Sequence, residues 1–263
     1  MQTTPDIVGD ITDVPSLSGR SVEVVVGAEE PTTFSVHEDL ICKASDFFQK
    51  AMSGSWKESS TRSIRLESHD SETFQVYLHW LYYHVLPVRV DSPGLDGNAE
   101  YLQLAKAYVL GDMFLDGDFK DAVIDAIIDK STSKASDGQY WYPVGPVIRY
   151  IYDNTLHPSK ARSLLVDLYT ASGHGEWLSD WAQPGDLPKE FLHNLAISLL
   201  DKRNYNGVDR PGNSSCTYHE HGTDGKFCYR SKLPKTDVKH SKSPSSETLV
   251  LLGVAGSRAV RGR

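Results

Sequence analysis

The stretch that decides the fold is FSVHEDLICKASDFFQKAMSGSWKES, residues 34–59. Apolar side chains in residues 40–52 recur at the i, i+3, i+4 and i+7 spacing of one helix face, and Ser45 is placed to cap a second, slightly rotated helix. Gly54 stands where the chain must turn out of that helix. The stretch therefore predicts two short helices that directly follow a strand ending in SVH.

The flanking sequence predicts the rest of a small sheet. Residues 21–36 hold two apolar runs separated by the turn-prone GAEEP, a pattern typical of a hairpin. SIRL, residues 63–66, places Ile64 and Leu66 on one face and indicates a third strand. VLPVRV, residues 85–90, suggests one more short strand.

Helical periodicity dominates the sequence beyond this sheet. Asp70 is the expected N-cap of a helix over residues 71–83, and a helical hairpin follows, with Asp118 as the cap of its second helix. The helices expected after residue 70 cover residues 71–83, 99–115, 119–130, 147–152, 160–170 and 188–202.

Charge and composition limit the possible functions. The chain has 263 residues and a formal net charge of −8, with 15 Lys and Arg against 29 Asp and Glu in residues 1–200 and 12 against 6 in residues 201–263. An acidic body argues against binding along a nucleic-acid backbone.

The chain has three cysteines, no signal-like start and no apolar run near the roughly 20 residues that cross a bilayer. We therefore expect an intracellular protein of the cytoplasm, the nucleus or both.

Residues 34–59, together with the following SIRLESHDSETFQVYLHWLYY, resemble a BTB/POZ domain, and YLQLAKAYVLGDMFLDGDFKDAVIDAI resembles its closing helices. The motif order is nearest to a group of short fungal BTB/POZ proteins. The resemblance implies an α+β fold in which a small three-stranded sheet is flanked by a helix cluster, followed by an all-helical extension and a disordered tail. It also implies a non-enzymatic module that binds other proteins.

The expected organisation has five parts. They are a flexible N-terminus over residues 1–20, a BTB/POZ domain over 21–130, a linker over 131–145, a helical extension over 146–203 and a disordered basic tail over 204–263.

The resemblance leaves two kinds of protein partner open. BTB domains that recruit a cullin ubiquitin-ligase scaffold often carry a hydrophobic residue, any residue and Glu after the helix matching residues 71–83, whereas LYYHVLPVRV has no Glu. Strand-exchanged homodimers usually need a long N-terminal strand and helix, of which residues 1–20 hold only fragments. A substrate adaptor for a cullin-based ligase is the first hypothesis, and a self-associating architectural or transcription-linked factor is the alternative. Neither involves a small-molecule substrate or a membrane.

Aromatic and apolar side chains near the end of the 71–83 helix would offer a partner helix a groove. The residues expected to bind a partner are Tyr82, Tyr83, His84, Val85 and Tyr101.

One cluster in the tail has the composition of a metal site. CTYHEHGTDGKFC brings together Cys216, His219, His221 and Cys228, four ligand types that suit tetrahedral zinc. The spacing matches no standard zinc finger, so a zinc-binding regulatory tail and a disordered tail with incidental ligands both stay open. No other cofactor is expected, and no nucleophile with a partnered base is found.

Overall fold

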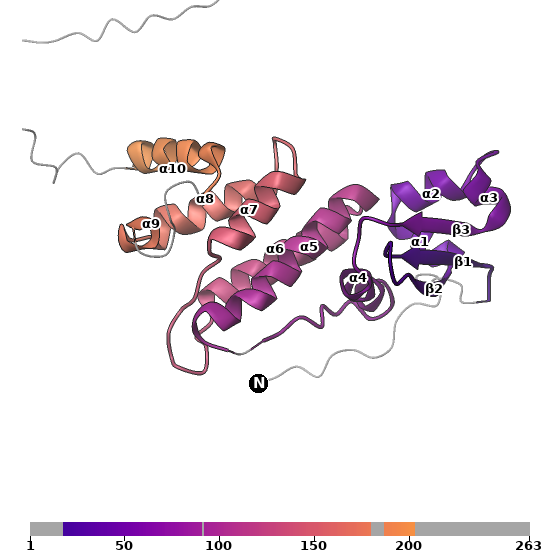
Figure 1. Cartoon of the computed structure of the whole chain (residues 1–263), viewed down its shortest axis with the longest axis horizontal. Coiled ribbons are helices and arrows are strands. Elements are labelled where there is room, and N and C mark those ends of the chain that lie inside the picture. The colour runs from indigo at the N-terminus through magenta and orange to yellow at the C-terminus, as the bar shows by residue number, and fades with distance from the viewer. Residues whose placement is uncertain (1–17, 91, 180–186, 203–263) are drawn as a thin grey trace, which may run out of the picture. The chain divides into compact units, whose positions relative to one another are not determined.

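The predicted three-stranded sheet is present in the computed structural model, which describes residues 18–90, 92–179 and 187–202 (Figure 1). The strands β1 (Ser21–Val26), β2 (Thr32–His37) and β3 (Ser63–Leu66) lie in the order β2-β1-β3. β1 is antiparallel to β2 and parallel to β3. Along β1 every second residue is a fully buried valine, so one face of the sheet packs into the core.

Four helices complete the first part of the domain, and their ends follow local sequence signals. They are α1 (Glu38–Ala44), α2 (Asp46–Met52), α3 (Lys57–Thr61) and α4 (Ser71–Tyr83). Ser45 caps α2 as predicted, because its hydroxyl accepts a hydrogen bond from Phe48 N–H at 3.3 Å. Asp70 caps α4 in the same way through Thr73 N–H at 2.7 Å. Gly54 turns the chain after α2 with a φ of 77°.

An aromatic cluster joins α2 and α4 to the helical hairpin of α5 (Asn98–Phe114) and α6 (Gly117–Thr132). A short 3-10 turn, η1 (Gly94–Gly97), precedes α5. Phe114 is fully buried, with its ring centroid 4.9 Å from those of Phe48 and Tyr77 and 6.1 Å from that of Phe74. Each buried aromatic contributes on the order of 2 kcal/mol through apolar burial, so this cluster anchors the hairpin to the domain.

Two local predictions were wrong. The cap of α6 is Asp116, whose carboxylate accepts Phe119 N–H at 2.9 Å, whereas Asp118 is exposed within the first turn. Residues 85–90 form no strand. Leu86, Val88 and Val90 are half-buried while the residues between them are exposed, and Lys130 of α6 donates to the Val90 carbonyl at 3.4 Å. The apolar alternation therefore reflects partial burial against the core without strand pairing.

The helices predicted in the C-terminal extension are present, together with one short helix that was not predicted. The extension consists of α7 (Gly145–Asn154), α8 (Lys160–Ser172), α9 (Glu176–Ser179) and α10 (Lys189–Lys202). α7 packs on α5 and α8, and α10 packs on α8. Within the described residues, no helix is long and apolar enough to cross a membrane.

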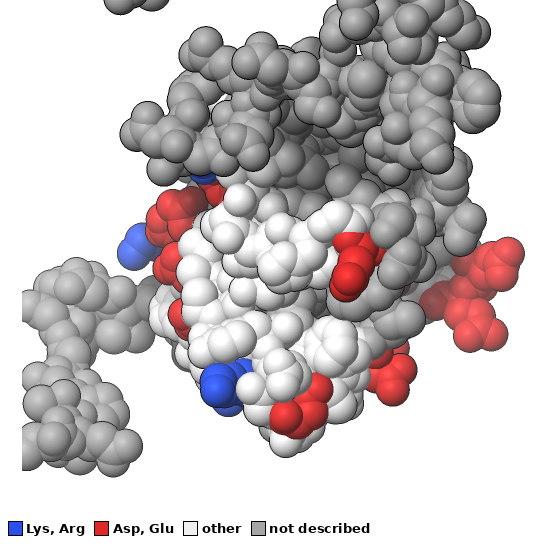
Figure 2. All heavy atoms as spheres, turned by 90° about the vertical axis from the view of Figure 1, so that its left-hand side faces the viewer, with Lys and Arg blue, Asp and Glu red and all other residues white. Residues whose placement is uncertain are grey.

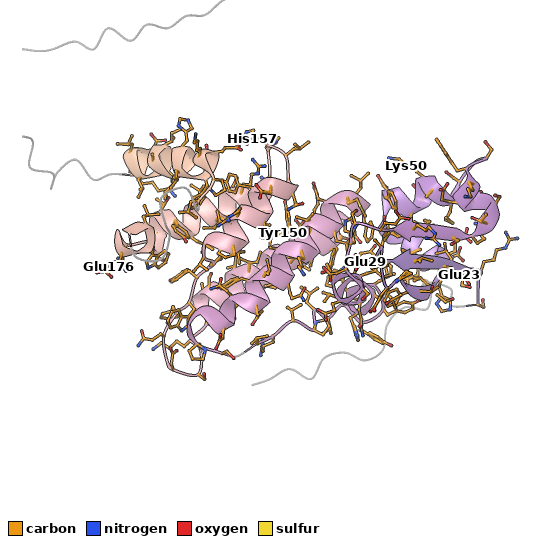
Figure 3. The ribbon with its side chains drawn as sticks, viewed as in Figure 1. Glu23, Glu29, Lys50, Tyr150, His157 and Glu176 are labelled. Carbon is orange, nitrogen blue, oxygen red and sulfur yellow. The ribbon has the colours of Figure 1, made fainter. Side chains whose placement is uncertain are left out.

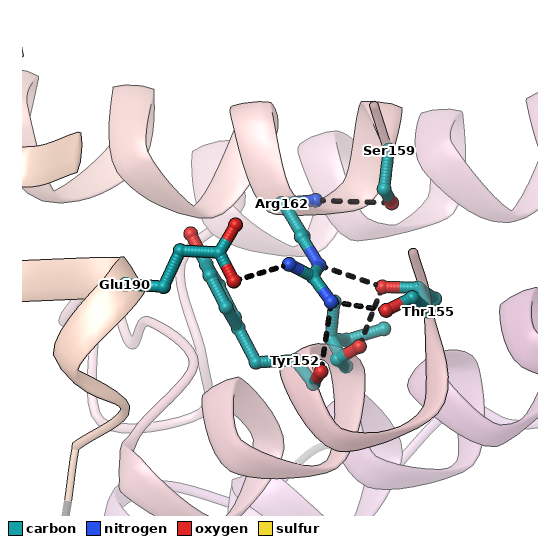
Figure 4. Close-up of polar contacts among 6 residues, drawn as sticks. Tyr152, Thr155, Ser159, Arg162 and Glu190 are labelled. Carbon is teal, nitrogen blue, oxygen red and sulfur yellow. Dashed lines mark hydrogen bonds and ion pairs between the residues drawn. The ribbon is translucent and has the colours of Figure 1, made fainter. Parts of the chain in front are cut away.

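The buried guanidinium of Arg162 joins three of these helices (Figure 4). It donates to the Tyr152 carbonyl at 2.8 Å, the Thr155 hydroxyl at 2.9 Å and the Glu190 carboxylate at 2.7 Å. It also donates to the Thr155 carbonyl. Because these partners belong to the end of α7 and to α10, Arg162 holds the extension together.

Candidate protein-interaction surface

The C-terminal end of α4 exposes large apolar side chains. Tyr83 is 69% exposed and Val85 is 54% exposed. Between them His84 adopts the left-handed conformation, with a φ of 52°, and its N–H closes the helix by donating to the Trp80 carbonyl at 2.8 Å. The turn therefore projects three consecutive exposed side chains, Tyr83, His84 and Val85, which we call the α4-end surface.

Tyr82 supports this surface from beneath. Its hydroxyl oxygen accepts a hydrogen bond from His37 N–H at 3.1 Å and lies 2.8 Å from His37 Nδ1. His37 directly precedes α1, but its ring makes no cap hydrogen bond to that helix and contacts Tyr82 instead. Tyr82 is half-buried, so it positions the end of α4 against β2.

The segment that follows the α4-end surface is also held in place. The Glu100 carboxylate accepts Val90 N–H at 2.8 Å and forms a 2.8 Å ion pair with Lys130 Nζ. Lys130 also donates to the Val90 carbonyl at 3.4 Å. Both ends of residues 83–90 are therefore fixed to the domain, which lowers the entropy lost when a partner binds there.

Tyr101 lies apart from the other predicted partner-binding residues. It is 1% exposed, and its hydroxyl donates to the Trp141 carbonyl at 2.8 Å. Burial, followed by the nearby charge of Glu100, raises the pKa of the Tyr101 hydroxyl. Tyr101 therefore belongs to the core between α5 and the 131–145 segment, where a partner does not reach it.

The predicted zinc ligands Cys216, His219, His221 and Cys228 lie outside the described residues, so zinc binding there stays a prediction. Among residues 18–90, 92–179 and 187–202, no group of three or more His, Cys, Asp or Glu side chains could hold a metal ion.

A second apolar surface, which the sequence analysis missed, lies on α10. Phe191 and Leu195 are buried on one face of this helix, while a row of apolar side chains on the other face is exposed. We call this row, Leu192, Ala196, Leu199 and Leu200, the α10 stripe. Figure 2 shows the end of the extension, where uncharged side chains cover a broad area between scattered charged ones. The i, i+4, i+7 and i+8 spacing of these residues was visible in the sequence. It did not stand out, because the same helix also carries the apolar stripe that faces the core.

Residues 15–116 match the family model of the BTB/POZ domain. Residues 15–116 therefore form a BTB/POZ domain, a module of protein–protein interaction. The three-stranded sheet with its flanking helices and the helical extension that the resemblance implied are confirmed in the described residues, whereas the tail expected to be disordered lies outside them. Among solved structures, the chain is similar to the BTB domain of zebrafish PATZ1. That match has 13% sequence identity and a TM-score of 0.30, and it covers 41% of this chain and 76% of that chain. No curated protein matches the chain.

Proposed function

We propose that this chain is a non-enzymatic adaptor whose BTB/POZ domain binds a cullin scaffold through the α4-end surface, with the helical extension available to carry a substrate. The role requires an intracellular protein, in the cytoplasm, the nucleus or both. The resemblance to short fungal BTB/POZ proteins makes a fungal cullin the first partner to test.

The observation that carries the proposal is the exposure of Tyr83 and Val85 on a backbone that is fixed on both sides. Large apolar side chains that stay exposed in a folded domain are typical of binding sites. Tyrosine is also enriched among the residues that dominate binding energy, because its ring gives much contact area for few rotatable bonds. The missing Glu in LYYHVLPVRV removes one contact from the usual cullin motif but leaves this apolar surface intact.

The test is a calorimetric titration of the full chain with the N-terminal domain of a fungal cullin scaffold. We expect saturable binding with a Kd of about 1 μM or tighter, and a rise in Kd of about tenfold or more for Tyr83→Ala. Absence of binding, checked by a second method, would remove the adaptor role.

Tyr140→Ala is the matched control, because Tyr140 is another exposed tyrosine and lies in the 131–145 segment, away from α4. We expect its Kd to equal that of the unmodified chain. Circular dichroism should show the same helix content in both variants. Equal weakening by the two substitutions would exclude the α4-end surface as the binding site.

The α10 stripe favours a second candidate function, self-association of the chain. An apolar row on the last described helix could pair with the same row of a second copy, since it carries no charge that would oppose itself. Light scattering of the full chain tests this: we expect a dimer that Leu199→Glu converts to a monomer. A monomer at all concentrations would exclude it.

A further inference from the structure

A groove of about 620 Å³ lies on the BTB/POZ domain between α2, α3 and β3. Its inner part is apolar, because it is lined by the buried Ile64 and the half-buried Phe47 and Ala51. Two large side chains that line it stay exposed, Trp56 at 68% and Leu115 at 51%. An exposed tryptophan beside an apolar groove is typical of a side chain that anchors a partner. The groove therefore suits a ligand with apolar side chains.

The charged side chains of the groove are mostly basic, although residues 1–200 hold 29 Asp and Glu against 15 Lys and Arg. Lys50, Lys57 and Arg65 line it, against the single acid Glu58. Lys50 lies on α2 (Figure 3), and within the described residues neither Lys50 nor Lys57 forms an ion pair. Arg65 has only a long contact, 3.8 Å, with an exposed glutamate, a geometry that contributes little. This basic rim therefore favours an acidic ligand.

One side of the groove is an edge of the sheet. Within the described residues β3 is the outer strand and pairs with β1 alone, and the Leu66 carbonyl faces β1 because it accepts Gly27 N–H at 3.1 Å. Backbone groups of successive strand residues point to opposite edges, so those of Ser63 and Arg65, which both line the groove, point away from β1. An extended peptide can therefore add to this edge by main-chain hydrogen bonds.

The two faces of β3 determine which side chains such a peptide needs. The side chains of an added strand alternate between the faces of the sheet. One set lies on the face of the buried Ile64, where the groove is apolar, and the other lies on the face of the exposed Arg65. Neighbouring strands pair side chains that share a face, so an acidic side chain suits Arg65. The edge therefore favours a segment in which aliphatic and acidic residues alternate.

A second copy of the chain does not offer this chemistry through its own β3 edge. Pairing of two such edges would bring the Arg65 side chains of the two copies toward each other and would set one basic rim against the other. Like charges that face each other across paired strands are destabilising. The charge of the groove therefore selects a different, acidic partner.

We propose that this groove binds an extended segment of another protein, in which aliphatic and acidic residues alternate, as an added strand at the edge of β3. Lys50 and Lys57 attract the acidic segment to the groove, and Trp56 contacts its aliphatic side chains. The groove shares no residue with the α4-end surface or the α10 stripe. It is therefore an additional binding site and does not depend on the proposed cullin contact.

Calorimetric titration of the full chain with a synthetic peptide tests the proposal. The probe is an acetylated and amidated octapeptide of alternating valine and aspartate, and we expect saturable binding with a Kd of about 100 μM or tighter. Two matched peptides should bind about tenfold more weakly or worse: one has lysine in place of aspartate, and one has the same composition as the probe in two blocks. Absence of saturable binding of the probe up to about 1 mM, or equal binding of the three peptides, would overturn the proposal.

Substitutions in the chain locate the site. Trp56→Ala should raise the Kd of the probe about tenfold, and Lys57→Glu should raise it about threefold or more, because repulsion replaces attraction at the rim. Lys43→Glu is the matched control for charge, since Lys43 is an exposed lysine of α1 outside the groove, and it should leave the Kd unchanged. Circular dichroism should show the same helix content in all variants. Equal weakening by Lys43→Glu and Lys57→Glu would contradict the proposed site.

Backbone methylation of the probe tests whether it adds as a strand. At a sheet edge the N–H groups of alternate peptide residues face β3 and the others face away, so methylating the valine nitrogens or the aspartate nitrogens removes different sets. We expect one methylated peptide to lose about tenfold in affinity or more, and the other to stay within about twofold of the probe. Equal affinities of the two would show that the peptide does not extend the sheet and would contradict the proposal. Affinity that strengthens as the chain is diluted would show that a second copy covers the edge, and would overturn the choice of partner.

Discussion

The hydroxyl of Tyr82 lies 2.8 Å from Nδ1 of His37 and accepts the backbone N–H of the same residue at 3.1 Å. This paired contact joins the last turn of α4 to the end of β2 across 45 residues of sequence. It connects the sheet to the helix end that carries the α4-end surface. The stability of the fold and the geometry of the proposed binding site therefore both depend on the Tyr82 hydroxyl.

Tyr82→Phe removes this hydroxyl and leaves the half-buried His37 N–H without its acceptor. We expect the free energy of unfolding, measured by urea titration, to fall by about 1 to 2 kcal/mol. Tyr83→Phe is the control, because Tyr83 is exposed and its hydroxyl makes no hydrogen bond to the described residues; its effect should stay within about 0.5 kcal/mol. Equal losses in the two variants would contradict the assigned role of Tyr82.

Asp116, the residue that directly precedes α6, stabilises the junction between α5 and α6 through two side-chain hydrogen bonds. Its carboxylate accepts Phe119 N–H at 2.9 Å and the Tyr77 hydroxyl at 3.1 Å, and burial raises its pKa although both hydrogen bonds oppose that shift. Asp116→Ala should lower the free energy of unfolding by about 2 kcal/mol. The exposed Asp118 interacts mainly with the helix dipole, so Asp118→Ala should cost under about 1 kcal/mol. A larger loss of stability for Asp118→Ala than for Asp116→Ala would instead support Asp118 as the cap, as the sequence predicted.

Local signals in the sequence were sufficient for most of the fold. Ser45 and Asp70 were predicted as caps because each precedes an apolar helical period, and both accept the expected backbone hydrogen bond. The choice between Asp116 and Asp118 depended on where Phe119 packs, since a cap two residues earlier suits the same pattern. That information lies in the contact of Phe119 with Tyr77, which a single local window does not contain.

The candidate surfaces were harder to predict because exposure is a property of the whole fold. Tyr83 and Tyr101 both follow apolar helical patterns, yet one is exposed and the other is covered by the 131–145 segment. The apolar alternation of residues 85–90 was mistaken for a strand because Leu86, Val88 and Val90 are half-buried, the first two against the core, without pairing with the sheet. When a distant segment covers a residue in the fold, the sequence next to that residue does not show it.

Cys42 should make the stability of the chain sensitive to alkaline pH. Its thiol pKa is raised from 9.0 to about 11, first by burial and then by the charges of Glu38 and Asp39. The folded state therefore favours the protonated thiol. Its contribution to stability is complete below pH 9, where the thiol is protonated in both states, and is lost as the pH rises from 9 to 11.

Urea unfolding at several pH values between 8 and 11 checks this, with Cys42→Ser as the comparison. We expect the unmodified chain to lose more stability than the variant over pH 9 to 11, since other titrating groups are common to both. Alkylation of Cys42 by iodoacetamide, followed by peptide mass spectrometry, should also be slow at pH 8 and accelerate toward pH 11. Parallel stability curves and rapid alkylation at pH 8 would show an ordinary thiol.

Arg162 determines whether the helical extension behaves as one unit. Arg162→Met keeps much of the side-chain volume but leaves the carbonyls of Tyr152 and Thr155 without their charged donor. Removing one partner of a buried ionic network costs about 3 to 5 kcal/mol, so we expect hydrogen exchange of the α7, α8 and α10 amides to accelerate by at least a hundredfold. The β1 amides should change less, because they belong to the BTB/POZ core.

Glu190→Gln is the control that separates the effect of charge from that of geometry. The Glu190 side chain is half-exposed, and glutamine keeps a hydrogen-bond acceptor for Arg162, so the loss of stability should stay under about 1 kcal/mol. Equal acceleration in β1 and α8 for Arg162→Met would show that the extension and the sheet unfold together, and that Arg162 supports the whole described fold.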